Sequence, residues 1–168
     1  MSSKEHKKHA PAKLAVGLIT VSTTRTAEDD KAGQWIKKRI AKEGHDMVLY
    51  EIVRDDSVLI ASAVTDALTD ISPDVLLMTG GTGISRKDVT IEAVRPFFKK
   101  ELTAFGPIFA QLSYEEIDSA ALLSRATAGV AGETVIFCMP GSLHACKLAC
   151  KALIFPELGH LIRHVKEN

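Results

Sequence analysis

Two kinds of segment alternate along most of this chain: short apolar runs, and longer stretches in which apolar residues recur every three or four positions. The apolar runs are rich in β-branched residues, and several are apolar at successive positions. Successive apolar residues are typical of strands that are buried on both faces. We therefore predict strands at residues 13–22, 46–53, 75–78, 124–130 and 134–139.

The segment 28–44 carries the clearest helical pattern. Trp35, Ile36 and Ile40 recur at helical spacing, acidic residues cluster at the start, and basic residues cluster at the end. Gly44 stands where a glycine commonly ends a helix. Further helices are predicted at residues 58–71, at 90–100 with an interruption at Pro96, at 107–118, from 143 onward and at 156–166.

Strands and helices alternate over the first half of the chain, which is typical of right-handed βαβ units and a mostly parallel sheet covered by helices on both faces. Gly132 joins the last two predicted strands through a connection too short for a crossover, so we expect one antiparallel edge strand. The predicted fold class is α/β with three α/β/α layers. No internal repeat or linker divides the chain, so residues 13–168 are predicted to form one domain.

Residues 1–12 differ from this pattern, because they are polar and rich in Lys and His. We expect a flexible basic N-terminal arm, which is either a solvated tail or a segment that touches nucleic acid or a partner. The same residues lack the apolar stretch of a secretory signal, and no apolar run approaches the roughly 18 residues of a membrane span. We therefore expect a cytoplasmic protein without a membrane partner.

The charges of the chain balance. Its 168 residues include 21 Lys and Arg against 21 Asp and Glu, which gives a formal net charge of zero. Proteins dedicated to duplex DNA usually carry a basic excess, since their affinity comes largely from neutralising phosphates. We therefore expect no nucleic-acid partner for the domain, and any anion that it binds must be held by a local arrangement of groups.

Four polar segments follow predicted strands: residues 22–24, 55–56, 79–88 and 140–142. Ligands of open α/β sheets bind outside the carboxyl ends of the strands. The third segment is the most informative, because residues 80–83 contain three glycines. Glycine buries no side chain, so such a loop either exposes backbone N–H groups to an anion or makes a simple tight turn. It lacks both the P-loop pattern and the third glycine of a dinucleotide fingerprint.

Three polar residues in these segments allow two interpretations each. Asp55 and Asp88 either cap a following helix, with Asp56 as the alternative cap beside Asp55, or bind Mg²⁺. Ser142 either caps the helix that begins near residue 143 or helps the start of that helix to hold an anion.

The cysteines are odd in number, which argues against a disulfide framework. Cys146 and Cys150 share one helix face, where they either pack as small apolar residues or join His144 in a metal site. His160 and His164 have the same spacing but lack the accompanying glutamate and a third ligand of a zinc site.

Five segments together resemble the molybdenum cofactor biosynthesis proteins of the MoaB/Mog type. They are GLITVSTTR at 17–25, VRDD at 53–56, TGGTGISRKDVTIEA at 79–93, LSRATAGV at 123–130 and MPGS at 139–142. The resemblance covers residues 13–165 and implies a symmetric trimer, or a hexamer made of two trimers. It also implies transfer of AMP from ATP to the terminal phosphate of molybdopterin, with release of pyrophosphate. The molybdenum-insertion protein of the pathway is a further candidate partner.

The resemblance assigns roles to residues of this chain. Asp55 and Asp88 match the two essential aspartates of the family and are the predicted catalytic residues and Mg²⁺ ligands. Arg86 or Lys87 either offsets developing charge or belongs to a solvated loop. The predicted substrate-binding residues are Ser22, Thr79, Gly80, Gly81, Thr82, Gly83, Pro140, Gly141 and Ser142.

Two positions depart from the family pattern, since Pro107 and Ala110 stand where the family usually has Glu and Arg. The departures indicate either drift in a packing helix, an altered substrate contact or a changed subunit interface. Some members of the family are weak or inactive as adenylyltransferases, so a fold match does not guarantee the reaction. The alternative hypotheses are a non-enzymatic molybdopterin carrier and a generic nucleotide-binding domain.

Overall fold

The computed structural model describes residues 13–167, and the arm predicted at residues 1–12 lies outside this range. The strands are β1 (Ala15–Val21), β2 (Asp46–Val53), β3 (Val75–Thr79), β4 (Lys100–Glu101), β5 (Thr127–Ala131) and β6 (Thr134–Met139). The α-helices are α2 (Lys31–Lys42), α3 (Ser57–Asp66), α4 (Thr90–Val94), α5 (Phe105–Ile117), α6 (Leu143–Ala149) and α7 (Phe155–Lys166). Shorter helical turns are η2 (Ala67–Ile71), η3 (Arg95–Phe97), η4 (Asp118–Leu123) and η5 (Cys150–Ile154).

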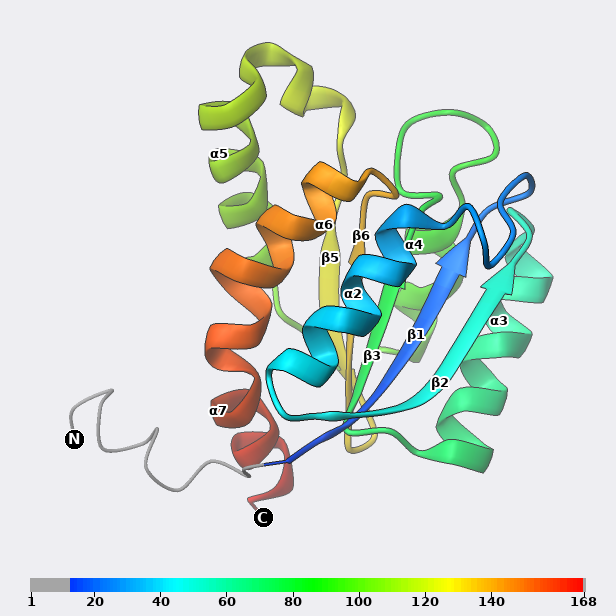
Figure 1. Cartoon of the computed structure of the whole chain (residues 1–168), viewed down its shortest axis with the longest axis vertical. Coiled ribbons are helices and arrows are strands. Elements are labelled where there is room, and N and C mark those ends of the chain that lie inside the picture. The colour runs from blue at the N-terminus through cyan, green and yellow to red at the C-terminus, as the bar shows by residue number, and fades with distance from the viewer. Residues whose placement is uncertain (1–12, 168) are drawn as a thin grey trace.

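Within the described residues, the strands form one sheet in the order β2-β1-β3-β6-β5-β4 (Figure 1). Strands β2, β1, β3 and β6 are parallel, β5 runs antiparallel to β6, and β4 runs antiparallel to β5. The predicted mostly parallel sheet with an antiparallel edge is confirmed. Thr20 pairs with Thr79, which in turn pairs with Met139, so the carboxyl ends of the central strands meet at one edge.

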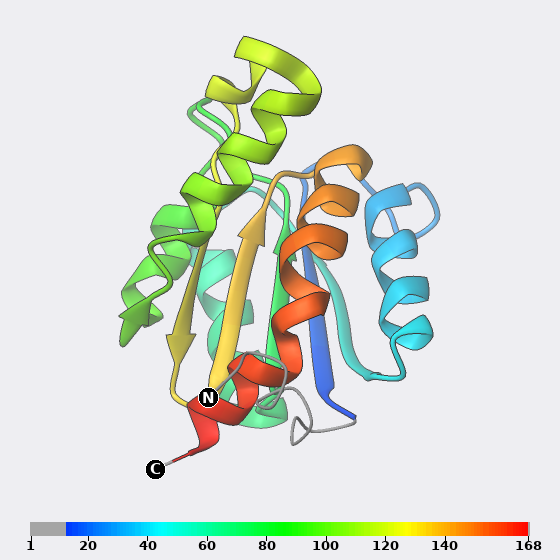
Figure 2. The ribbon, with the colours of Figure 1, turned by 90° about the vertical axis from the view of Figure 1, so that its left-hand side faces the viewer.

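Helices cover both faces of the sheet, which gives the three predicted layers (Figures 1 and 2). Helices α2, α5, α6 and α7 pack on one face, and α3 and α4 pack on the other. Neighbouring residues of β1 divide between the two cores: Leu18 belongs to the first and Ile19 to the second. Every residue of β3 and β6 is buried, which explains their nearly continuous apolar runs.

Helix α2 shows how the sequence signals translate into helix ends. Asp30 precedes its first residue and accepts a hydrogen bond from Gly33 N at 2.9 Å. Asp30 is fully buried and also accepts from Thr20 Oγ1 and Tyr50 OH, at 2.6 and 3.0 Å. The acidic residues expected in the first turn of α2 instead lie at its cap and in the loop before it, since α2 begins after Asp30. Gly44 has φ +83° and ends the helix as predicted.

The region after the glycine-rich segment differs in part from the prediction. The interruption predicted at Pro96 is confirmed, since α4 is followed by the 3₁₀ turn η3 where Pro96 lacks the N–H that would continue the α-helix. Lys100 then enters β4, which pairs with β5 through two residues only. A strand of this length leaves no periodic signal in the sequence. The strand expected from residue 124 begins at Thr127.

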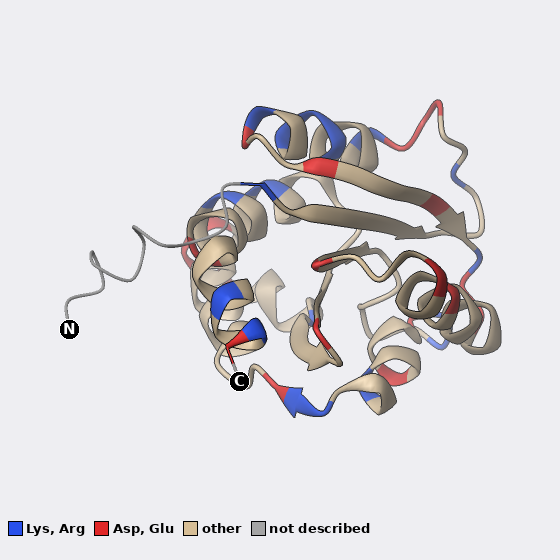
Figure 3. Cartoon of the chain, turned by 90° about the horizontal axis from the view of Figure 1, so that it is seen from below, with Lys and Arg blue, Asp and Glu red and all other residues tan. Residues whose placement is uncertain are grey.

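Charged residues occupy the outer surfaces of the helices and the loops. In the view of Figure 3, basic and acidic segments are interspersed rather than collected in one block, in line with the zero net charge. The described part of the chain contains no helix with the length and apolar character needed to cross a membrane.

Candidate functional site

A cavity of about 280 Å³ opens at the carboxyl edge of the sheet. Its walls come from the loops that follow β1, β2, β3 and β6, together with the end of η4. The structure thus brings together the four polar segments that the sequence analysis singled out. The lining residues are Val21, Ser22, Thr24, Arg25, Asp55, Gly80, Gly81, Thr82, Gly83, Asp88, Leu123, Ser124, Pro140 and Gly141.

The glycine-rich loop after β3 requires its first two glycines. Gly80 and Gly81 have φ +98° and +62°, the left-handed region that side chains disfavour. A Cβ on Gly80 would lie 2.2 Å from Val21 O, so this residue also permits a close approach to β1. Thr90 stabilises the loop through two hydrogen bonds: its Oγ1 donates to Gly80 O at 2.8 Å and its N–H donates to Gly81 O at 2.9 Å. The loop shape is therefore specified by several independent contacts.

The two predicted catalytic carboxylates flank this loop. Asp55 Oδ2 accepts from Thr23 Oγ1 at 2.7 Å, and its Oδ1 lies 3.3 Å from the Cβ position of Gly81. Asp88 Oδ2 accepts from Ser85 N at 2.8 Å and lies 2.8 Å from the Cβ position of Gly83. Both carboxylates therefore line one cavity, Asp55 from the loop after β2 and Asp88 from the loop after β3.

The capping alternative belongs to other residues. Asp56 caps α3 by accepting from Val58 N and Leu59 N, at 2.9 and 3.0 Å, which leaves Asp55 to face the cavity. Helix α4 begins after Val89 and has no side-chain cap, so Asp88 is not its cap either.

The ionisation of Asp88 follows from its contacts. Burial raises its pKa, but hydrogen bonds from Ser85 and Gly83 and the positive charge of Arg125 outweigh that effect. The pKa of Asp88 is lowered as a result, so its carboxylate is negatively charged at neutral pH.

The second loop, residues 140–142, packs directly on the first. A Cβ on Gly141 would lie 3.1 Å from Gly80 Cα and 3.3 Å from Arg25 Nη1. Thr79 is buried and donates from Oγ1 to Pro140 O at 3.0 Å, so it joins the loops rather than lining the cavity. The two loops behave as one wall of the site.

Three hydroxyl groups have different roles in the site. Ser142 lies outside the cavity lining and caps α6, because its Oγ accepts from Ala145 N at 3.1 Å. The Oγ of Ser22 accepts from the N–H groups of Thr24 and Arg25 and shapes the turn after β1. Thr82 lines the cavity, and its buried Oγ1 has no hydrogen-bond partner within the described residues. A buried hydroxyl without a partner is costly, which points to a missing ligand or water.

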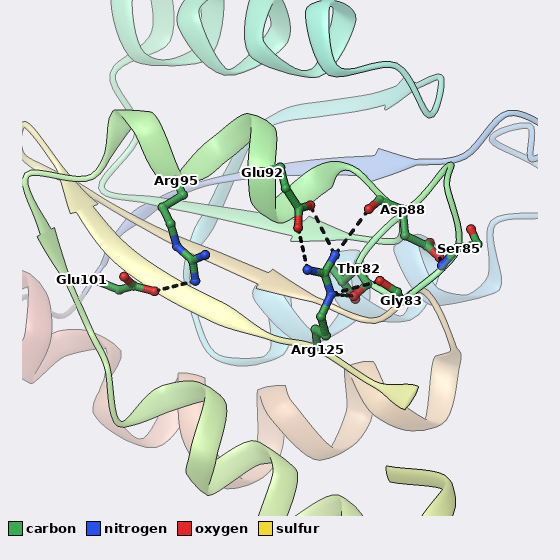
Figure 4. A network of polar contacts seen from close by, with 8 residues as sticks. All are labelled: Thr82, Gly83, Ser85, Asp88, Glu92, Arg95, Glu101 and Arg125. Atoms are coloured by element: carbon green, nitrogen blue, oxygen red, sulfur yellow. Dashed lines mark hydrogen bonds and ion pairs between the residues drawn. The ribbon is translucent and has the colours of Figure 1, made fainter. Parts of the chain in front are cut away.

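The positive charge of the site comes from residues that the sequence analysis did not select. Arg86 and Lys87 are exposed and lie outside the cavity lining. Arg25 lines the cavity, and Arg125 contacts the glycine-rich loop from behind (Figure 4). Both arginines stand inside segments that carry the family resemblance, GLITVSTTR and LSRATAGV, which was the available signal.

The described residues contain no group of three or more His, Cys, Asp or Glu that could hold a metal ion by themselves. Cys146 and Cys150 are buried, and burial raises the pKa of the Cys146 thiol to about 11. Cys146 Sγ contacts Thr79 Oγ1 and donates to Pro140 O, as a small core residue would. His144 pairs with Glu116 instead.

The protein family described as "Probable molybdopterin binding domain" matches residues 17–160, a range that includes every residue lining the cavity. The chain belongs to this family. The resemblance to the MoaB/Mog type is thereby confirmed over the matched range, which includes the loops that line the cavity.

Relatives of the molybdopterin-binding domain match over their full length. Molybdenum cofactor biosynthesis protein B of Bacillus subtilis (strain 168) is 47% identical over 169 residues, which cover 100% of this chain and 99% of the relative. Molybdopterin adenylyltransferase of Pyrococcus furiosus is 41% identical over 173 residues, covering 99% and 100%. A crystal structure of a Molybdenum cofactor biosynthesis protein B superposes with a TM-score of 0.89 at 45% identity, covering 94% of this chain and 98% of the other.

Proposed function

We propose that this protein acts in molybdenum cofactor biosynthesis as a molybdopterin adenylyltransferase. An oxygen of the terminal phosphate of molybdopterin attacks the α-phosphorus of ATP, the bond from that phosphorus to the bridging oxygen breaks, and pyrophosphate leaves. One observation carries the proposal: a glycine-rich anion-binding loop, flanked by Asp55 and Asp88, lines one cavity in a family of molybdopterin-binding domains. The name of the Pyrococcus furiosus relative supports the same reaction.

The nature of the cavity wall fits a reaction without a general base. Among the described residues, the lining contains no His and no Cys. None is needed, because the second pKa of a phosphate monoester is near 6 and the attacking phosphate is largely a dianion at neutral pH. The protein instead brings two anions together, so catalysis consists of positioning and charge neutralisation.

The residues of the cavity divide this work. The backbone N–H groups of the glycine-rich loop and the free hydroxyl of Thr82 hold a phosphate of the substrate. Gly141, packed on Gly80, keeps the second loop close enough to contact the same ligand. Arg25, which lines the cavity, offsets the negative charge that develops on the phosphates. Arg86 and Lys87, which were expected to do so, are exposed and can contact phosphates only at the rim of the cavity.

Asp55 and Asp88 fit a Mg²⁺ site. They face one cavity, Asp55 from the loop after β2 and Asp88 from the loop after β3, and Asp88 is held in its anionic form. Mg²⁺ in proteins is commonly held by one or two carboxylates together with substrate phosphates, so two carboxylates suffice. When bound, the ion neutralises negative charge on the phosphates of ATP.

An exposed apolar surface supports self-association to a trimer or hexamer. We define the α5 patch as Ile108, Tyr114, Ile117, Leu122 and Leu123, whose side chains are 41–83% exposed. In Figures 1 and 2, α5 and η4 project past the end of the sheet. Exposed apolar side chains gathered on neighbouring elements mark interaction sites, and Leu123 joins the patch to the cavity. Solution mass from light scattering tests this assembly, and a monomer would contradict it.

The departures from the family pattern lie on the same helix. Pro107 and Ala110 are exposed on α5 and do not line the cavity of the chain. Their position favours a changed interface over an altered contact with substrate inside one subunit.

The deciding experiment is incubation of the protein with molybdopterin, ATP and Mg²⁺, with AMP transfer and pyrophosphate release measured together. We expect both for the wild-type protein. Asp88→Asn is expected to keep the fold and molybdopterin binding while AMP transfer falls by at least about 10²-fold, because a neutral amide holds Mg²⁺ less well than a carboxylate. A wild-type rate in Asp88→Asn would remove Asp88 from the mechanism. Molybdopterin binding without AMP transfer by the wild-type protein would indicate a carrier. Tight ATP binding without pterin binding would indicate a generic nucleotide-binding domain.

A further inference from the structure

One side chain outside the predicted site joins both ends of the glycine-rich loop. Arg125 precedes β5, and its Nε donates to Thr82 O and to Gly83 O, both at 3.0 Å. Its Nη2 donates to Asp88 O at 3.3 Å (Figure 4). The guanidinium therefore binds carbonyl groups at residues 82, 83 and 88, on either side of the exposed tip of the loop.

Glu92 on α4 holds the other side of this guanidinium. Arg125 Nη1 lies 2.5 Å from Glu92 Oε1, and Nη2 lies 3.2 Å from Oε2. Such a two-point contact fixes the plane of the guanidinium as well as its place. Arg125 therefore links the start of the loop, at Thr82, to helix α4, which follows the loop and carries Glu92.

The contacts of Arg125 also orient peptide groups. In a trans peptide the N–H points away from the C=O, so turning the carbonyls of Thr82 and Gly83 toward Arg125 turns the next two N–H groups away from it. The first of these N–H groups belongs to Gly83, whose Cβ position lies 2.8 Å from Asp88 Oδ2, so the peptide that Arg125 orients lies beside that carboxylate. The arginine thus acts on the place of this carboxylate through the backbone, at Gly83 and at Asp88 O.

We propose that Arg125 is a positioning residue of the adenylyltransferase site, which keeps the glycine-rich loop in its anion-binding shape and Asp88 in place, and that Glu92 orients Arg125. The proposal rests on the proposed function for its catalytic consequence. Arg125 does not line the cavity, so it acts through the loop and not on the substrate.

The chain offers a matched control in a second Arg–Glu pair. Arg95 Nη2 lies 3.0 Å from Glu101 Oε1, and Glu101 also accepts from Thr127 Oγ1 at 2.8 Å. The side chains of this pair are 55% and 33% exposed, comparable with 36% and 53% for Arg125 and Glu92. Figure 4 shows both pairs in one view, with the Arg95 pair away from the loop.

The kinetic test compares Arg125→Lys, Glu92→Gln and the control Arg95→Lys. Lysine keeps the charge but cannot reach three carbonyls and two carboxylate oxygens at once, so we expect kcat for AMP transfer to fall about 10²-fold. Glu92→Gln is expected to lower kcat only about tenfold, because Arg125 keeps its hydrogen bonds to the loop carbonyls when the carboxylate of Glu92 is lost. Arg95→Lys should stay within about twofold of wild type.

A second readout is independent of activity. Amide hydrogen exchange at Gly81, Gly83 and Ile84 should be faster in Arg125→Lys than in wild type, and unchanged in Arg95→Lys. If the wild-type protein transfers no AMP, the proposed function fails, while the exchange rates still decide whether Arg125 orders the loop. Exchange and kcat of Arg125→Lys equal to those of Arg95→Lys would overturn the proposal. If Arg125→Lys does not fold, wild-type exchange and kcat in Glu92→Gln would overturn it equally.

Discussion

The two ends of the sheet both carry a cavity, and the larger one is at the end without the predicted chemistry. The cavity at the amino end has a volume of about 360 Å³, against about 280 Å³ at the carboxyl edge. Its charged pair is already bonded: Asp74 Oδ1 lies 2.5 Å from Lys166 Nζ, and Oδ2 accepts from Ala15 N at 2.7 Å. Volume alone therefore does not distinguish the two ends.

At the carboxyl edge the corresponding groups are left open. Within the described residues, the Arg25 guanidinium has no ion pair and Thr82 Oγ1 has no hydrogen-bond partner, although both residues line the cavity. The backbone also adopts positive φ at Gly80 and Gly81, against a neighbouring strand. Unsatisfied polar groups are a cost that a ligand can offset, which is why this end is the better candidate.

The largest effect should come from adding one methyl group at the carboxyl edge. Gly80→Ala combines φ +98° with a Cβ 2.2 Å from Val21 O, so we expect the free energy of unfolding to fall by about 3 kcal/mol. Gly132→Ala, near the amino end, has φ +62° with nothing within 4 Å of its Cβ and should cost about 1 kcal/mol. Urea unfolding of both variants measures the difference. Equal losses would mean that the loop tolerates the contact with β1.

A smaller effect is expected from removing one cation at each end. Arg25→Gln should lower kcat/KM for AMP transfer about tenfold, because a charge that faces the phosphates is lost. Lys166→Gln removes a cation that is already paired with Asp74, so kcat/KM should stay within about twofold and only stability should change, by about 1 kcal/mol or less. Steady-state kinetics of the two variants decide the matter. An equal loss of kcat/KM in both would remove the distinction between the two cavities.

The smallest effect concerns the pH dependence of stability. The pKa of Asp88 is lowered from its usual 3.8 in the folded protein, so its carboxylate stabilises the fold fully above that value. This contribution disappears as the pH falls through the folded-state pKa. The difference in unfolding free energy between wild type and Asp88→Asn should therefore be constant from pH 7 to about pH 5 and shrink below it. Urea titrations between these values and pH 3 provide the check, and a difference that grows on acidification would contradict the lowered pKa.

Much of the fold could be predicted because its signals are local. The apolar runs of β1, β3 and β6 are visible in the sequence, since both faces of each strand are buried. Gly44 and Asp56 mark helix ends through their own backbone and side-chain chemistry. Strand β4 escaped prediction because its two residues are defined only by pairing with β5.

The candidate site divides in the same way. By itself the sequence determined that residues 80–83 form an unusual loop, that carboxylates follow two of the strands, and that the chain resembles a molybdopterin-binding family, because these features are written in short segments. It could not choose between Asp55 and Asp56 as a helix cap, or identify the arginines that serve the loop. Arg125 lies 33 residues from Glu92 and 42 from Gly83, so only the tertiary structure brings them together. Pairing between distant charges depends on how the layers pack, and no local pattern records it.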